Sequence, residues 1–143
     1  MMSSFTIARI LLFTVVIVYL ISAPISFQQL AKSSAADGAA NDQFGYSSAI
    51  SGDVALVGAY KAEVGSNSDQ GAAYIFRSSD GGATWPSSET QKLTASDGAW
   101  GDYFGRSSAI SGDVALVCAN LGSNNNQGAA YIFRSSDGGA TWP

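Results

Sequence analysis

The stretch DGAANDQFGYSSAISGDVALVGAY, residues 37–60, decides the fold, because it returns 60 positions later as DGAWGDYFGRSSAISGDVALVCAN, residues 97–120. Eighteen of these 24 positions are identical. A second block, GAAYIFRSSDGGATWP, occupies residues 71–86 and recurs unchanged at residues 128–143, 57 positions later. Three residues have been lost from the polar segment between the blocks, where a length change leaves strand register intact. The chain is therefore a repeat protein.

Each repeat contains the pattern of a small antiparallel sheet. In the first repeat, apolar runs at 54–57 and 72–76 are bounded by turns rich in Gly, Ser and Asp, and a mixed segment at 44–50 precedes them. A more polar fourth strand is expected from Thr84 to Leu93. Neither apolar run alternates, so both faces of the sheet should be covered. The pattern predicts an all-β fold of two four-stranded antiparallel blades, a partial β-propeller.

The amino terminus has the composition of a targeting segment. A short polar stretch with one positive charge precedes an uncharged apolar run at 10–21, and these are the n-region and h-region of a signal peptide. We expect residues 1–26 to form a hydrophobic helix. It acts either as a signal peptide, cleaved after Ala23, or as a signal anchor that holds the chain in a membrane through residues 10–27. Both alternatives place the rest of the chain on the extracellular side, secreted or membrane-anchored.

Residues 27–143 hold the two repeats, at about 37–96 and 97–143, and the second repeat is truncated in its last strand. Propellers typically contain four to eight blades, so two blades cannot close a ring. Two explanations stay open. The chain is a fragment of a longer product, or copies form a homo-oligomer in which the strand near residues 29–32 completes the last blade of a neighbour.

Composition excludes several kinds of chemistry. The chain has 143 residues and no histidine, which removes His-dependent catalytic triads and His metal sites. The single cysteine, Cys118, cannot form an intrachain disulfide, and it is expected to pack as a small apolar side chain. Seven Lys and Arg against eleven Asp and Glu give a formal charge of -4 with no basic cluster. No nucleic-acid partner is therefore expected.

One part of the repeat resembles a known family. Phe44-Gly45 followed by Val57-Gly58-Ala59, with its copy in the second repeat, resembles the FG-GAP repeat of integrin alpha chains and of many secreted microbial and algal proteins. The resemblance implies propeller blades in a non-catalytic binding or adhesion module with a protein or glycan ligand. Two departures stand out: the Pro that closes the family motif is replaced by Tyr60 and Asn120, and the motif's second Gly becomes Cys118 in the second repeat.

Another part resembles the Asp-box turn of sialidases and other secreted propellers. The run from Ser78 to Trp85, and its copy from Ser135 to Trp142, fit the pattern S-x-D-x-G-x-T-W. The Asp and Ser should bond backbone amides around a hairpin between the third and fourth strands, with the Trp packed beneath it, which makes the box structural. Its residues are Ser78, Asp80, Gly82, Thr84, Trp85, Ser135, Asp137, Gly139, Thr141 and Trp142.

The Asp boxes also raise the alternative of a fragment of a sialidase-like propeller glycosidase. Such enzymes use a cluster of arginines on the substrate carboxylate, but here Arg77 and Arg134 are repeat equivalents and Arg106 corresponds to Tyr46. Recurrence in each repeat is typical of a scaffold position, so no catalytic residue is assigned. A further alternative is a two-blade lectin that oligomerises into a full propeller.

Calcium enters through the FG-GAP resemblance, because integrin blades carry an Asp-rich loop before the strand that leads into the end of the motif. Here that place holds tight turns with one carboxylate each, Asp53 and Asp113, too short for six to eight oxygen ligands. The polar loop at 65–70 adds only Asp69, and its copy adds none. We expect no cofactor, with these three residues as weak calcium candidates.

Positions that differ between the repeats are the better functional candidates, because a ligand site normally occurs once. Aromatic and charged residues at such positions are expected to contact a sugar or a protein. These candidates are Trp100, Tyr103, Arg106, Tyr46 and Tyr60. Neutral drift on a surface would produce the same differences, and that interpretation stays open.

Overall fold

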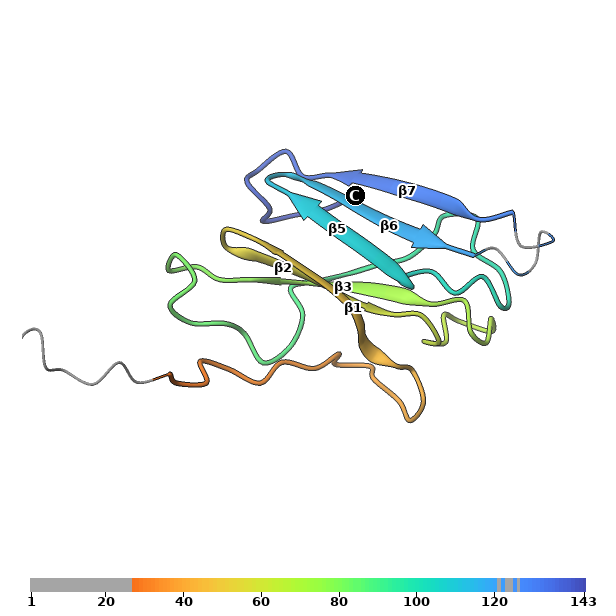
Figure 1. Cartoon of the computed structure of the whole chain (residues 1–143), viewed down its shortest axis with the longest axis horizontal. Coiled ribbons are helices and arrows are strands. Elements are labelled where there is room, and N and C mark those ends of the chain that lie inside the picture. The colour runs from red at the N-terminus through yellow and green to blue at the C-terminus, as the bar shows by residue number, and fades with distance from the viewer. Residues whose placement is uncertain (1–26, 121, 123–124, 126) are drawn as a thin grey trace, which may run out of the picture.

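Two antiparallel β-sheets make up the fold in the computed structural model, which describes residues 27–120, 122, 125 and 127–143 (Figure 1). The first sheet, here called blade 1, has the order β1-β2-β3-β4, and the second, blade 2, has the order β5-β6-β7. The strands are β1 (Phe44–Ser51), β2 (Val54–Ala59), β3 (Ala72–Arg77), β4 (Gln91–Leu93), β5 (Ser107–Ser111), β6 (Val114–Ala119) and β7 (Ala129–Arg134). The predicted all-β class and antiparallel order are confirmed.

The predicted amino-terminal helix and the cleavage after Ala23 lie outside the described residues. In the part of the chain that the structure does describe, no helix has the length and apolar character needed to cross a membrane.

The first hairpin of each blade turns within two residues, and the register is the same in both blades. Ser51 pairs with Val54, so Gly52 and Asp53 form the whole loop. Gly52 has a φ of 55°, in the left-handed region that glycine adopts without a side-chain clash. The same register then places Val54 and Leu56 on one face of β2 and Ala55 and Val57 on the other.

The fourth strand is shorter than the sequence predicts, and in blade 2 the described residues form no fourth strand. Only Gln91–Leu93 pair with β3, in the register Ala73↔Leu93 and Ile75↔Gln91. The expected strand fails earlier because the Trp85 ring is held back in its turn by a bond from Nε1 to the Gly82 carbonyl oxygen. Pro86 then has no N–H to donate to a ladder. The prediction of four strands is therefore confirmed for blade 1 only, and blade 2 has three strands among the described residues.

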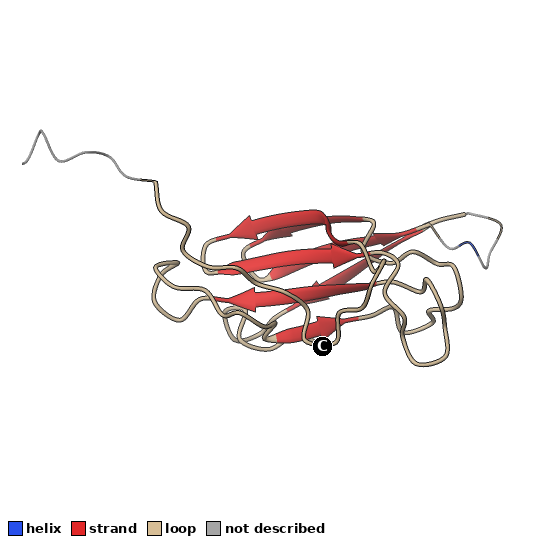
Figure 2. Ribbon diagram, turned by 90° about the horizontal axis from the view of Figure 1, so that it is seen from below, coloured by secondary structure: helices blue, strands red, loops and turns tan. Residues whose placement is uncertain are grey.

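The blades stack face to face, with β5, β6 and β7 over β1, β2 and β3 (Figures 1 and 2). Val54, Leu56 and Ile75 of blade 1 form one core with Ala115 and Val117 of blade 2. Polar contacts join the same layers. They include a bond between the Ser47 and Ser108 hydroxyls at 2.9 Å, the Ser51 hydroxyl accepting from Gly112 N at 3.0 Å, and Arg77 Nε donating to the Gly138 carbonyl oxygen at 3.3 Å.

Burial on both faces, predicted for the middle strands of each repeat, is found only in blade 1. The face of blade 1 turned away from blade 2 is partly covered by the segment that leads into β1, seen in orange in Figure 1. Tyr74 and Phe76 are buried there, while Ala55 and Val57 are half-buried. On the outer face of blade 2, Val114 is 36% exposed and Ile132 is 72% exposed. The prediction is wrong for blade 2 because, among the described residues, no layer covers that face.

Candidate functional site

The site begins at the turn that leads into β5. Tyr103 N donates to the Asp69 carbonyl oxygen at 3.0 Å, and Phe104 N donates to the Gln70 carbonyl oxygen at 2.8 Å. The Phe104 ring is fully buried and meets Tyr131 edge-on with 5.4 Å between ring centroids. The turn is therefore fixed by blade 1 on one side and by its own blade on the other.

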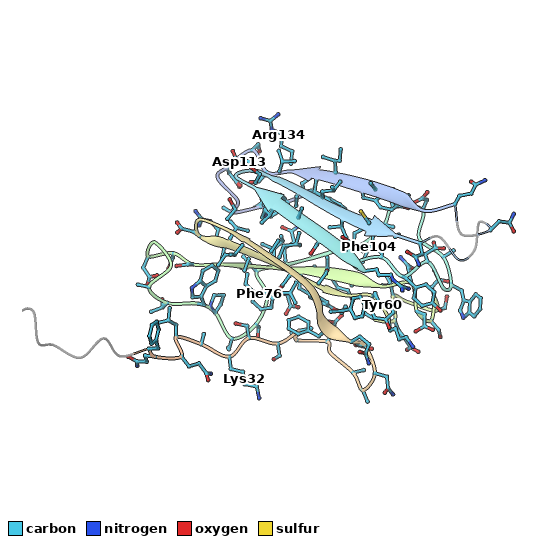
Figure 3. All side chains as sticks on the ribbon, viewed as in Figure 1. Lys32, Tyr60, Phe76, Phe104, Asp113 and Arg134 are labelled. Carbon is cyan, nitrogen blue, oxygen red and sulfur yellow. The ribbon has the colours of Figure 1, made fainter. Side chains whose placement is uncertain are left out.

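Four of the five predicted contact residues gather around one ring. The Tyr60 ring centroid lies 4.4 Å from that of Tyr46 and 5.7 Å from that of Tyr103. The Arg106 guanidinium carbon lies 5.6 Å from the same centroid, a cation–π distance. We call Tyr46, Tyr60, Tyr103 and Arg106 the tyrosine cluster; Tyr60 is labelled in Figure 3. Tyr46 is 52% exposed, so the cluster opens to solvent.

Stacking of the innermost strands explains why these residues meet. Tyr46 and Arg106 are repeat equivalents, each placed at the start of its blade. The Ser47 hydroxyl donates to the Gly105 carbonyl oxygen at 2.8 Å, which holds β1 beside β5 and brings both positions to Tyr60. Sequence comparison showed that these positions differ between the repeats, but only the stacking places them together.

Trp100, the fifth predicted contact residue, stands apart from the cluster. Its side chain is 66% exposed, and among the described residues its ring makes no stacking contact. Gly101 beside it is tied to blade 1 through a bond from Gly101 N to the Ser68 carbonyl oxygen. Trp100 is therefore an exposed ring on a fixed turn.

A polar hollow that sequence reasoning missed adjoins the cluster. The Lys61 ammonium lies 5.9 Å from the Tyr60 centroid, and the same residue lines the hollow, whose volume is about 320 Å³. One wall is fixed by the Asp42 carboxylate, which accepts from Ala39 N at 2.8 Å. The hollow is lined by Ala39, Ala40, Asn41, Asp42, Lys61, Glu63 and Asp69. The sequence signal that could have pointed to this hollow is Lys61, which directly follows the aromatic residue Tyr60.

The three calcium candidates occupy separate places. Asp53 and Asp113 lie in the β1–β2 and β5–β6 turns, where their carbonyl oxygens accept from Ser78 N at 2.8 Å and Ser135 N at 2.9 Å. Asp69 lies in the wall of the polar hollow. Across the described residues, no group of three or more His, Cys, Asp or Glu side chains has an arrangement that could hold a metal ion.

The Asp-box residues are engaged within their own turns. The Asp80 carboxylate accepts from Thr84 N at 2.8 Å and from the Thr84 hydroxyl at 2.5 Å, and the buried Ser78 hydroxyl accepts from Gly82 N at 2.9 Å. The Thr84 hydroxyl is the first cause that lowers the pKa of Asp80 to about 2. In the second box, Asp137 accepts from Thr141 in the same way, and the Thr141 hydroxyl holds the pKa of Asp137 well below its usual range.

The arginines do not form the group that the sialidase resemblance implies. Arg77 pairs with Val54 and Arg134 pairs with Val114, at the hairpin end of each blade. Arg106 lies at the opposite end, before Ser107, which pairs with Cys118. In Figure 3, Arg134 and Tyr60 accordingly lie at opposite ends of the stacked sheets. In the described part of the chain, no pocket gathers the three guanidinium groups.

Comparison with known proteins gives one result. A family model described as FG-GAP repeat matches residues 27–76 and 87–133, more than half of the chain. The two matches begin 60 residues apart, and each ends inside the third strand of its blade, β3 or β7. Each therefore spans one stretch ahead of a blade plus that blade's first three strands. No curated protein sequence matches the chain.

Proposed function

The chain belongs to the FG-GAP repeat family, and on this premise we propose that it is a non-catalytic binding module on the extracellular side that holds a neutral glycan on the tyrosine cluster. The predicted family resemblance is thereby confirmed. FG-GAP repeats occur in extracellular and surface proteins and suggest a propeller-type binding or adhesion module. The observation that carries the finer proposal is the convergence of three tyrosine rings from positions that differ between the repeats.

The cluster offers two complementary kinds of contact. Tyrosine ring faces are electron-rich and attract the weakly positive C–H faces of a pyranose ring, while their hydroxyls hydrogen-bond at the edge. The polar hollow supplies carboxylate acceptors for sugar hydroxyls from Asp42, Glu63 and Asp69, and Lys61 supplies a donor. A ligand that spans both would stack on Tyr60 and place its hydroxyls in the hollow.

The charge around the site favours a neutral glycan over an anionic one. Three carboxylates of the hollow stand against two cations, Lys61 and Arg106, and both cations already lie near the Tyr60 ring. An anionic sugar would meet net repulsion on entering the hollow. The absence of an arginine group among the described residues supports the same choice, because a sialoside needs a partner for its carboxylate.

Screening the labelled protein against an array of neutral and acidic oligosaccharides tests the proposal, followed by calorimetric titration of a hit. We expect neutral glycans to bind, and Tyr60→Asn to weaken binding at least tenfold, about 1.4 kcal/mol. This variant is well matched, because asparagine already occupies the equivalent position 120. Asn120→Ala is the control and should leave the affinity unchanged.

Two results would overturn the proposal: binding to acidic sugars only, or equal affinity for the wild type and Tyr60→Asn. Trp100→Ala separates the cluster from the isolated ring. We expect it to change affinity less than twofold, because Trp100 makes no ring contact with the cluster. Turnover of a sialoside by the wild type would instead favour the glycosidase alternative.

A further inference from the structure

The outer face of blade 2 is the uncovered twin of a covered face in blade 1. We use "twin" for the residue at the equivalent position of the other repeat, 60 positions away before the polar loop and 57 after it. Val114 and Ile132, 36% and 72% exposed, are the twins of Val54 and Ile75, which are 4% and 0% exposed. Blade 2 therefore exposes a copy of the surface with which blade 1 packs against blade 2.

The matching counterpart is an apolar hollow on the far face of blade 1, with a volume of about 410 Å³. Its floor contains Ala55, Val57 and Phe76. The twins of these residues are Ala115, Val117 and Phe133, which receive Val54, Leu56 and Ile75 inside the chain. The hollow is lined by Leu30, Ala31, Ser33, Ile50, Ala55, Val57, Phe76 and Trp85.

The edge of β7 that faces away from β6 is a second surface that no described residue of the chain pairs with. In blade 1, β4 pairs with β3 in the register Tyr74↔Lys92. In blade 2, no described strand occupies that place on β7, and an opening of about 530 Å³ lies there, bordered by Tyr131, Ile132 and Pro143. An unpaired strand edge is a template for an extended segment.

Residues 31–35 have the position needed to fill that edge. The family matches begin 60 residues apart, which makes residues 31–33 the twins of β4. They lie against blade 1 much as β4 lies against blade 2: Ser33 Oγ donates to the Pro86 carbonyl oxygen, and Ala31 borders the hollow beside Trp85. Their other edge has no paired strand among the described residues.

A lysine contact marks the register. In blade 1, the Asp37 carboxylate pairs with Lys92 Nζ at 2.5 Å and accepts from the Tyr74 hydroxyl at 2.9 Å, and Lys92 lies 5.5 Å from the Tyr74 ring centroid. In blade 2, the Tyr131 hydroxyl donates to Asp97 at 2.8 Å, and no lysine completes the arrangement in the described residues. The twin of Lys92 is Lys32, which is exposed and points away from the blades in Figure 3.

We propose that copies of this chain associate head to tail. Residues 31–35 of one copy add to β7 of the next copy as its fourth strand, with Lys32 placed over Tyr131. The outer face of that blade 2 then fills the hollow on blade 1 of the first copy. This heterologous contact repeats the interface inside the chain.

The exposed face of blade 2 has Cys118 where the equivalent covered face of blade 1 has Gly58. Gly58 lies so close to the Gly105 carbonyl that a Cβ at Gly58 would collide with it. The Cys118 side chain would meet the Gly45 carbonyl of the neighbouring copy in the same way. The contact between copies is therefore weaker than the one inside the chain, and Cys118→Gly should strengthen it.

Cross-linking between two differently labelled batches of the full chain tests the strand register. One batch carries Ser33→Cys and the other Ala130→Cys, both with Cys118→Gly; the twins of these positions, Leu93 and Ala73, are paired. We expect a disulfide or short bismaleimide link between batches only when both are present. Replacing Ala130→Cys by Ser79→Cys, in an exposed turn, is the control and should give no link. Equal linking with the control, or none with either, would overturn the proposal.

Light-scattering mass against concentration gives a second readout that does not depend on the glycan proposal. We expect masses above that of a single chain that rise with concentration, a dissociation constant at least tenfold lower for Cys118→Gly, and a shift to the single-chain mass for Ile132→Asp. Ile132 is mostly exposed in one chain, so its replacement should leave folding intact, which circular dichroism checks. A single-chain mass for the wild type and Cys118→Gly at high concentration would overturn the association.

Discussion

Replacing one leucine in each repeat should have unequal effects, although the two leucines have identical neighbours in the sequence. Leu56 is fully buried between the blades, in the core that contains Val117 and Ile75. Its twin Leu116 lies on the uncovered face of blade 2 and is only half-buried. Leu56→Ala and Leu116→Ala therefore test whether the blades stack as described.

The expected magnitudes follow from burial. Truncating Leu56 removes the equivalent of about three buried methylene groups, each worth about 0.8 kcal/mol, and leaves a closed cavity. We predict a loss of about 3–4 kcal/mol in the free energy of unfolding. Leu116→Ala loses part of the same transfer free energy without forming a closed cavity, so we predict about 1 kcal/mol.

Urea unfolding followed by tryptophan fluorescence measures both changes. It should be run at a protein concentration at which the wild type has the mass of one chain, because Leu116 also lies in the proposed contact between copies. A difference of about 2 kcal/mol or more between the two variants is expected. Equal losses would refute the reasoning, because they would mean that both leucines are buried to the same extent.

Two further predictions concern a close approach and two carboxylates. Gly58→Ala should lower the free energy of unfolding by about 1–3 kcal/mol, because its Cβ would collide with the Gly105 carbonyl. Cys118→Ala should change the same free energy by less than about 1 kcal/mol. Similar losses for both variants in calorimetry would contradict the stacking of Gly58 on Gly105. The pKa of Asp80 is lowered to about 2, and that of Asp137 is lowered further. The bonds to these carboxylates therefore stabilise the fold at pH values above the unfolded pKa of about 3.9, and this stability is lost as the pH falls toward 2. The melting temperature should therefore decrease over that range, and less so in Asp80→Asn; an identical pH profile for this variant and the wild type would show that the Asp80 bonds add nothing.

Much of the fold was predictable from local patterns, because turns and apolar runs are short-range signals. The Gly52 turn and the apolar run that begins at Val54 placed the first hairpin correctly. The extent of the fourth strand was not predictable in this way, because the Trp85 ring bonds back to its own turn before the chain can reach β3. The burial of blade 2 depended on a neighbouring layer, which a strand pattern cannot reveal.

The sequence predicted the residues of the tyrosine cluster but not their arrangement in space. Comparison of the repeats selected Tyr46, Tyr60, Tyr103 and Arg106, because a position that differs can carry a single site. Their convergence arises from the stacking of β1 on β5, which is a long-range property. Lys61 and the polar hollow were missed because the hollow is assembled from turns that are distant in sequence.

Chemical-shift mapping of a bound neutral oligosaccharide tests the central claim most directly. The measurement compares amide spectra of the ¹⁵N-labelled protein with and without a glycan selected from the array. We predict that the largest shifts occur at Tyr46, Tyr60, Lys61 and Tyr103, with little change in the Asp-box turns. Shifts confined to other surfaces, with the tyrosine cluster unmoved, would contradict the claim that this cluster is the binding site.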